Sequence, residues 1–306
     1  MELWDVLANR LRAPPGPGWK FADCRAISPD GRAVAQQTAD PRRASVGDED
    51  VTVWDVETGN IRWIGAHAAS IKCVEYSPDG ATLAVACGDG TVHLWDHAGG
   101  TEKLVLMAQA VTSKTMHVSM AFTPDGRTLA WANTPFPPHT AAPGEPPGWE
   151  AKVWDATTGE ERWCCHGATG GVEAVAASAD GSLVAAAGTE SVGRRAVATV
   201  RLWDLATGQE RLLLRGRGET YQSVAFTPDG KSLAAGGGVF EYLPGDADLW
   251  DVPTGQLRAS LRGHPDLVNF VAFTPDGNTL ISASEDGTAK VWDATPLAPV
   301  PEPARE

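Results

Sequence analysis

The fold is decided by signals that stand together in residues 274–293, Thr-Pro-Asp-Gly-Asn-Thr-Leu-Ile-Ser-Ala-Ser-Glu-Asp-Gly-Thr-Ala-Lys-Val-Trp-Asp. In the opening tetrad, Pro275 sets φ near −65° and Gly277 accepts the positive φ that closes a tight turn. The run Thr279–Ser282 that follows is rich in strand-forming residues. The stretch therefore predicts a β-hairpin and then a further strand that ends at Trp292-Asp293.

Both signals recur in strict alternation along nearly the whole chain. The Trp-Asp pairs are Trp4-Asp5, Trp54-Asp55, Trp95-Asp96, Trp154-Asp155, Trp203-Asp204, Trp250-Asp251 and Trp292-Asp293. The turn tetrads are Ser28–Gly31, Ser77–Gly80, Thr123–Gly126, Ser178–Gly181, Thr227–Gly230 and Thr274–Gly277. Thr-Gly pairs after four of the Trp-Asp pairs predict a second hairpin in those repeats.

A Trp-Asp signature with a period in the forties resembles the WD40 family, and in particular bacterial-style WD40 repeat proteins. The resemblance implies an all-β WD40 β-propeller, in which each repeat forms one four-stranded blade (strands a to d). It also implies a non-catalytic scaffold for protein or peptide partners, but it names no partner. We expect a single propeller domain over residues 1–294 and a Pro-rich tail over 295–306.

The N-terminus predicts a partial blade. Residues 1–5 align with Val92–Asp96, so the chain starts at strand c, and residues 1–12 form only the c–d hairpin. Six complete blades follow, although Pro296, Pro299, Pro301 and Pro303 leave room for at most an irregular last strand. This arrangement suggests an incomplete seven-bladed ring whose first two strands were lost. The alternative is a closed six-bladed ring in which the N-terminal hairpin displaces or covers the last outer strands.

Four repeats carry extra residues between strands b and c. The distance from turn Asp to the next Trp is 24, 16, 29, 23, 21 and 16 residues, so repeats 1, 3, 4 and 5 exceed the minimum. In repeat proteins such insertions map to one face, which is often the binding face. The predicted partner-binding residues are Arg42, Arg43, Phe136, His139, Trp149, Arg194, Arg195, Phe240 and Tyr242. Alternatively, the aromatic side chains cap their own blades, and the arginines pair with Asp48, Glu49 and Asp50.

Two sets of residues match the structural hydrogen-bond network of the family. The first set is His67, Asp89 and Trp95, and the second is His264, Asp286 and Trp292 with Ser282 or Ser284. Repeat 2 has Ala86 and Cys87 in place of the hydroxyl, so we expect its network to be incomplete. Five cysteines without a C-x-x-C motif, and five other histidines without ligand spacing, predict no metal and no cofactor. Cys164 and Cys165 are expected to pack.

The composition of the chain narrows the range of possible functions. Lys+Arg 25 against Asp+Glu 39 gives a net charge of −14, which disfavours nucleic acid as a partner, and no apolar run is long enough to cross a membrane. Free thiols favour the cytoplasm. The alternative function is a propeller hydrolase or lyase with its site at the mouth of the central channel. The matched strand-a positions disfavour that alternative: Cys24, Cys73, Ser119, Ala174, Ser223 and Phe270.

Overall fold

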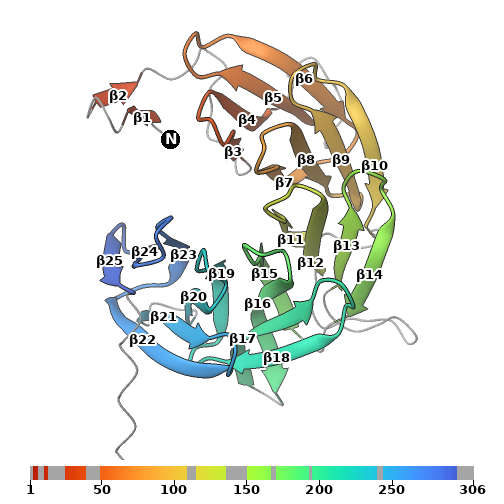
Figure 1. Cartoon of the computed structure of the whole chain (residues 1–306). Helices are drawn as coiled ribbons and strands as arrows, with labels where there is room; N and C mark the ends of the chain where they lie inside the picture. Colours follow the sequence, from red (N-terminus) through yellow and green to blue (C-terminus); the bar gives the residue numbers. More distant parts are fainter. Residues whose placement is uncertain are drawn as a thin grey trace, which may run out of the picture.

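A computed structural model of the chain describes residues 3–5, 10–12, 25–38, 49–108, 115–135, 150–166, 170–192, 195–239 and 244–294. The described chain is all-β, and it contains no helix. Its antiparallel sheets stand side by side around a common centre (Figure 1). This is the architecture of a WD40 β-propeller.

Five sheets have four strands, numbered here in chain order. Sheet 1 is β3(Arg25–Ile27), β4(Ala33–Thr38), β5(Glu49–Asp55) and β6(Ile61–His67). Sheet 2 is β7(Ile71–Tyr76), β8(Thr82–Cys87), β9(Thr91–Asp96) and β10(Glu102–Met107). Sheet 3 is β11(Thr115–Phe122), β12(Thr128–Pro135), β13(Glu150–Asp155) and β14(Glu161–His166). Sheet 4 is β15(Gly170–Ala177), β16(Leu183–Val192), β17(Arg195–Asp204) and β18(Glu210–Arg215). Sheet 5 is β19(Thr220–Phe226), β20(Ser232–Gly238), β21(Gly245–Asp251) and β22(Gln256–His264).

The last sheet differs from the prediction of six complete four-stranded blades. Sheet 6 has three described strands, β23(Val268–Phe273), β24(Thr279–Ser284) and β25(Ala289–Asp293). A fourth strand would come from residues 295–306, which lie outside the described residues and contain four prolines that cannot donate to a ladder. At the other end, β1(Leu3–Asp5) pairs with β2(Arg10–Arg12), as expected for the N-terminal hairpin. Whether the ring is six- or seven-fold stays a prediction.

Each turn tetrad is closed by its own side chains. In the first, Ser28 Oγ donates to Asp30 Oδ1 at 2.6 Å, and the same carboxylate oxygen accepts from the backbone N–H of Arg32 at 3.0 Å. Gly31 takes φ +69°, which an L side chain rarely adopts. All six tetrads repeat this pattern, and in all six the hydroxyl hydrogen bond lowers the pKa of the Asp.

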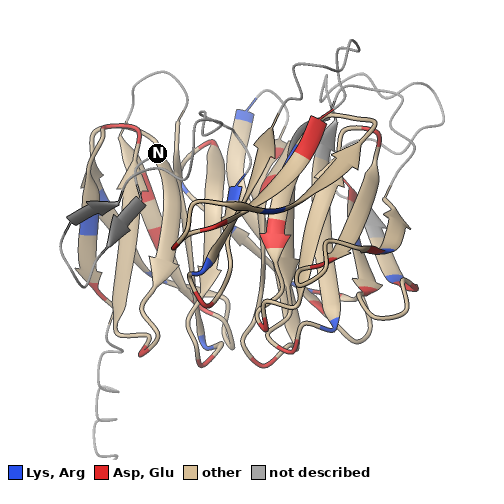
Figure 2. Ribbon diagram, turned by 90° about the horizontal axis from the view of Figure 1, so that it is seen from above, with Lys and Arg blue, Asp and Glu red and all other residues tan. Residues whose placement is uncertain are grey.

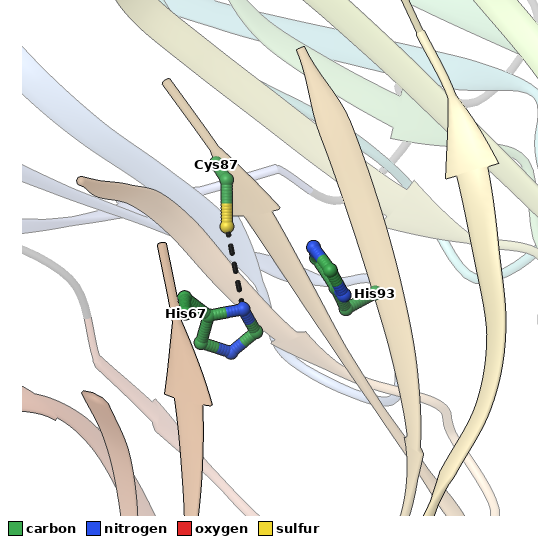
Figure 3. A group of neighbouring side chains, drawn as sticks. All are labelled: His67, Cys87 and His93. Atoms are coloured by element: carbon green, nitrogen blue, oxygen red, sulfur yellow. Dashed lines mark hydrogen bonds between the residues drawn. The ribbon is translucent and has the colours of Figure 1, made fainter. Parts of the chain in front are cut away.

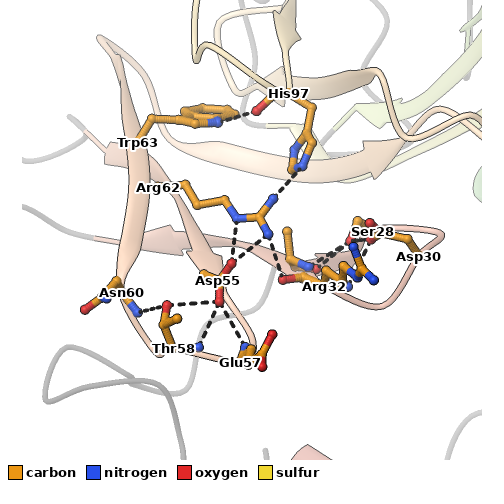
Figure 4. Close-up of polar contacts among 11 residues, drawn as sticks. Ser28, Asp30, Arg32, Asp55, Glu57, Thr58, Asn60, Arg62, Trp63 and His97 are labelled. Atoms are coloured by element: carbon orange, nitrogen blue, oxygen red, sulfur yellow. Dashed lines mark hydrogen bonds and ion pairs between the residues drawn. The ribbon is translucent and has the colours of Figure 1, made fainter.

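The Trp-Asp carboxylate organises the second hairpin and reaches the next sheet. Asp55 accepts hydrogen bonds from the backbone and hydroxyl of Thr58 and an ion pair from Arg62, which together lower its pKa (Figure 4). Arg62 also contacts the ring of His97, in the turn of sheet 2, at 3.1 Å. Trp63 then donates from Nε1 to the backbone oxygen of His97 at 2.8 Å. The turn is thus a joint between two sheets.

Neighbouring sheets bury their faces against one another. The apolar cluster around Val200, Leu202 and Trp250, for example, is formed by sheets 4 and 5 together. At the inner edge, Ser119 of sheet 3 accepts from the backbone N–H of Val175 of sheet 4 at 3.0 Å. The outer strands add a second contact, because the Nε1 atoms of Trp63 and Trp163 each donate to the following sheet.

The strand order separates two edges of the molecule. Antiparallel succession places the a–b and c–d turns at one edge, which we call the turn edge, and the b–c connections at the opposite one, which we call the loop edge. Figure 2 shows acidic residues on many of the turns along its lower side, which is the turn edge. The turn edge is therefore uniform from sheet to sheet, whereas the lengthened connections all leave from the loop edge.

A matched pair of glycines tests the contact between sheets. Gly208 (φ +70°) and Gly230 (φ +68°) have nearly the same backbone conformation, but a Cβ at Gly208 would lie 2.9 Å from Cγ of Trp163 and one at Gly230 would meet nothing within 4 Å. Both Gly→Ala variants should lose about 1–2 kcal/mol to the left-handed conformation. Gly208→Ala should lose a further roughly 1–3 kcal/mol because Trp163 is displaced. Urea denaturation of the two variants measures the difference, and equal losses would contradict the contact.

Candidate functional site

The predicted partner-binding residues belong in sequence to the four lengthened b–c segments. Most of them lie outside the described residues: Arg42, Arg43, Phe136, His139, Trp149, Arg194, Phe240 and Tyr242. Arg195 is described, and it is exposed at the first position of β17. The strands on either side of the lengthened connections are described in all four repeats, and they direct those connections to the same edge.

Repeat 4 differs from the expected loop insertion. Its extra residues lengthen β16 and β17, which pair without interruption from Leu183↔Asp204 to Val192↔Arg195. The sequence of this extension is rich in β-branched and small residues on both strands, which favours pairing over a loop. The hairpin therefore rises above the strands of its neighbours at the loop edge.

An ion-pair cluster fixes the base of this extended hairpin. Glu190 pairs with Arg201 at 3.1 Å and with Arg215 at 3.2 Å, while Arg201 also pairs with Glu210 at 2.7 Å. The Glu190 and Arg201 side chains are only 14% and 15% exposed, so these charges are more strongly coupled than those of a fully solvated pair. The extension is thereby held to the outer strand of its own sheet.

The His264 network joins sheets 5 and 6. Nδ1 of His264 lies 2.9 Å from Asp286, and its Nε2 lies 2.8 Å from the hydroxyl of Ser282. Trp292 donates from Nε1 to the same hydroxyl at 2.9 Å. The hydrogen bond from Thr288, with His264 adding to it, lowers the pKa of Asp286 to about 2. Ser284 has a different role: its hydroxyl donates to the backbone oxygen of Asp266 and accepts from the backbone N–H of Asp286 at 3.2 Å.

The corresponding set between sheets 1 and 2 is arranged differently. Nδ1 of His67 lies 3.5 Å from Sγ of Cys87 (Figure 3), whereas Asp89 accepts a hydrogen bond from the hydroxyl of Thr91 at 2.7 Å. Within the described residues, neither Nε2 of His67 nor Nε1 of Trp95 has a hydrogen-bond partner. His67 is 3% exposed, and this burial lowers its pKa to about 4.

Strand register identifies the missing group. Ser282 stands opposite Lys290 in sheet 6, and the residue opposite His93 at the same place in sheet 2 is Val85. The hydroxyl was expected to be missing at Ala86 and Cys87, but the residue equivalent to Ser282 is Val85. The two atoms left without partners are the equivalents of the two that Ser282 satisfies.

Two of the matched strand-a residues hold neighbouring sheets together. Ser223 accepts from the backbone N–H of Val271 at 3.1 Å, as Ser119 does from Val175, while Phe270 is exposed. Elsewhere, the thiol of Cys164 donates to Glu150 at 3.1 Å, so it has a polar partner and does not only pack. The side chain of Cys165 lies outside the described residues.

Comparison with known proteins agrees with this geometry. The family model "WD domain, G-beta repeat" matches residues 60–96 and 255–293. The chain is a WD40-repeat protein. This WD40 chain is 28% identical over 109 residues to Periodic tryptophan protein 2 of Saccharomyces cerevisiae, a match that covers 35% of the chain and 11% of that protein.

Two shorter matches also connect the chain to proteins of this kind. The Mitotic checkpoint protein bub-3 of Caenorhabditis elegans is 37% identical over 49 residues, 16% of this chain and 14% of that protein. WD repeat-containing protein SL1-17 of Schistosoma mansoni is 36% identical over 50 residues, 16% of this chain and 17% of that protein. The matches thus span less than a fifth of each relative. They support a general protein-interaction role for the WD40 repeats.

The described part of the chain offers no helix with the length and apolarity that a membrane crossing requires.

One cluster of side chains was not predicted from the sequence. His67, Cys87 and His93 each place a potential metal-ligating atom within 4.8 Å of the other two. Cys87 and His93 lie on the two strands of one β-hairpin, with Cys87 two positions beyond Val85, the partner of His93, whereas His67 comes from the neighbouring sheet. A Cys-x5-His spacing at a short b–c hairpin, together with the His that ends the preceding strand, would have been the signal.

Restoring the hydroxyl tests the account of the incomplete network. Val85→Thr keeps the side-chain volume and should supply the partner that His67 and Trp95 lack, so the variant should be at least as stable as the wild type. Val92→Thr is the control, because Val92 is equally buried but lies in an apolar cluster, where an unpaired hydroxyl should cost about 1–3 kcal/mol. Thermal and urea denaturation compare the two variants. Equal destabilisation would contradict the assignment of Val85.

A half-buried carboxyl on β7, that of Glu75, gives a pH-dependent prediction. Burial alone raises the pKa of Glu75 to about 7. In the unfolded chain Glu75 ionises near its ordinary pKa, so stability should be lost as pH rises from about 5 through 7. Glu75→Gln should remove this loss and be more stable than the wild type at pH 8, by at most about 3 kcal/mol. Glu160→Gln, at an exposed turn, is the control, and an unchanged pH profile of stability in Glu75→Gln would contradict the prediction.

Proposed function

We propose that the protein is a non-catalytic scaffold that binds a protein or peptide on its loop edge. The observation that carries this proposal is the difference between the two edges. The turn edge repeats one hydrogen-bonded pattern in every sheet, whereas four of the b–c connections are lengthened, each to a different extent. Variation confined to the loops of a rigid framework is typical of a binding surface.

The residue types support this surface. Aromatic residues and Arg are enriched at the centres of protein interfaces, and the lengthened connections supply Phe136, Trp149, Phe240, Tyr242 and Arg195. The other proposed contacts are Arg42, Arg43, His139 and Arg194. The net charge of −14 favours a basic peptide over an acidic one, over nucleic acid and over an anionic membrane. We propose a cytoplasmic location for this interaction.

The inner strands support a non-catalytic role. A channel-mouth site would draw polar side chains from matched strand-a positions. Ser119 and Ser223 instead accept hydrogen bonds from the next sheet, and Phe270 supplies no acid, base or ligand. These hydroxyls are already used to hold the sheets in place.

A peptide library tests the proposal. Peptides of about a dozen residues, balanced between basic and acidic sequences, would be selected on the wild-type protein, and the affinity of the best binder measured by calorimetry. Replacing Phe136, Trp149, Phe240 and Tyr242 together with Ala should weaken it at least roughly 100-fold, since each interface aromatic contributes about 1–2 kcal/mol or more.

The control removes four exposed apolar side chains from the outer strands. Ile61, Ile64, Val105 and Leu257 are exposed on these strands, away from their loop-edge ends. Their combined replacement by Ala should leave the affinity unchanged. If the outer-strand variant lost binding, or the loop variant kept it, the loop edge would not be the binding face.

A further inference from the structure

Two neighbouring sheets bring three potential metal ligands together. His67 ends β6 of sheet 1, and Cys87 and His93 lie on β8 and β9 of sheet 2. Their ligating atoms lie within 4.8 Å of one another, and the three side chains face one another in Figure 3. His67 and Cys87 are 3% and 4% exposed, whereas His93 is half-buried and gives the cluster a route to solvent.

The distances suit a tetrahedral ion. Zn²⁺ binds His nitrogen at about 2.0–2.1 Å and Cys sulfur at about 2.3 Å, so N and S atoms that share one zinc lie roughly 3.5 Å apart. Nδ1 of His67 lies 3.5 Å from Sγ of Cys87. The third side chain, His93, already has a ligating atom within 4.8 Å of those of His67 and Cys87, so a rotation of its ring would bring it to the ion.

The surroundings favour a cation. Nδ1 of His93 contacts Glu102, the kind of carboxylate partner that orients a metal-binding imidazole. Nε2 of His93 lies 2.9 Å from the hydroxyl of Thr91, so an ion at this nitrogen would displace that hydroxyl. The carboxylates of Asp89, Glu49 and Glu102 all act electrostatically on Cys87, so a cation bound to its sulfur would be attracted by three negative charges. A coordinated thiol loses its proton and binds as the thiolate.

The corresponding place between sheets 5 and 6 shows what the cluster replaces. The same positions there hold His264, Ser284 and Lys290, and His264 is bonded to Asp286 and Ser282. A lysine ammonium cannot ligate a metal. Thus one junction is closed by hydrogen bonds, while its counterpart lacks the hydroxyl and instead has a thiol and a second imidazole.

We propose that His67, Cys87 and His93 bind one borderline-soft divalent ion, Zn²⁺, which bridges sheets 1 and 2. Thiolate and imidazole ligands select such an ion over Mg²⁺ or Ca²⁺. With three protein ligands, the fourth position is open to water. This replaces the expectation of no metal, which considered spacing along the chain and not the junction between sheets.

Cobalt is the probe for the test. Tag-free, metal-stripped full-length protein would be titrated with Co²⁺ under reducing, thiol-free conditions. The expected result is one equivalent per chain, with a thiolate-to-cobalt charge-transfer band and tetrahedral d–d bands that Zn²⁺ abolishes. Zn²⁺ should also raise the thermal midpoint, because an ion that binds only the folded state stabilises it. No thiolate band, or octahedral spectra alone, would overturn the proposal.

Variants locate the ion. Cys87→Ser should lose the charge-transfer band, and His93→Lys, which introduces the sheet 6 residue, should lose tight binding. The double variant Cys164→Ser/Cys165→Ser is the control and should bind as the wild type does. Because a core variant can fail to fold, Glu102→Gln at a partly exposed position provides a second measurement, with Co²⁺ affinity weakened roughly 10- to 100-fold. A band that survives in Cys87→Ser, or unchanged affinity in Glu102→Gln with the fold intact, would refute the site.

Discussion

The structure depends on the burial of each sheet against its neighbours. A four-stranded antiparallel sheet with two apolar faces cannot bury either of them alone, so its stability has to come from adjacent sheets. The apolar clusters follow this rule, since residues such as Val200 and Trp250 belong to different sheets and to one core. Hydrogen bonds between neighbouring sheets then fix the distance between them. Serine hydroxyls reach the next backbone at the inner edge, and Trp63 and Trp163 do so at the outer edge.

These contacts explain why the junctions between sheets are sensitive to single atoms. One hydroxyl, on Ser282, satisfies both His264 and Trp292. Val85 at the equivalent place leaves two buried nitrogens unsatisfied, a cost of about 1–3 kcal/mol for each group without a partner. A junction with such a deficit gains more from an added ligand than one whose groups are paired, and it is the junction that also contains Cys87 and His93.

Local chemistry made most of the fold predictable from the sequence. The tetrads and Trp-Asp pairs predicted the strands because a turn is fixed by its own residues, as Ser28, Asp30 and Gly31 show. Features that depend on which strands pair or which sheets pack together were harder to predict from the sequence. The extra residues of repeat 4 were expected to form a loop, yet they extend a hairpin that Glu190 ties to Arg201 and Arg215. The cluster of His67, Cys87 and His93 was not predicted, because its members come together only when two sheets pack against each other. The predicted binding residues other than Arg195 lie outside the described residues.

Sequence change is therefore constrained differently at the turn edge, at the loop edge and at the junctions between sheets. At the turn edge, each Asp is tied to its own turn by hydrogen bonds that lower its pKa, so sequence change there would break the hairpin itself. At the junctions, change is limited by packing against the next sheet. The b–c connections at the loop edge are subject to neither constraint, since β16 and β17 lengthen without disturbing the strands below them. A framework that fixes one edge and the junctions between its sheets leaves the other edge free to diversify, and this freedom supports the proposal that a partner binds there.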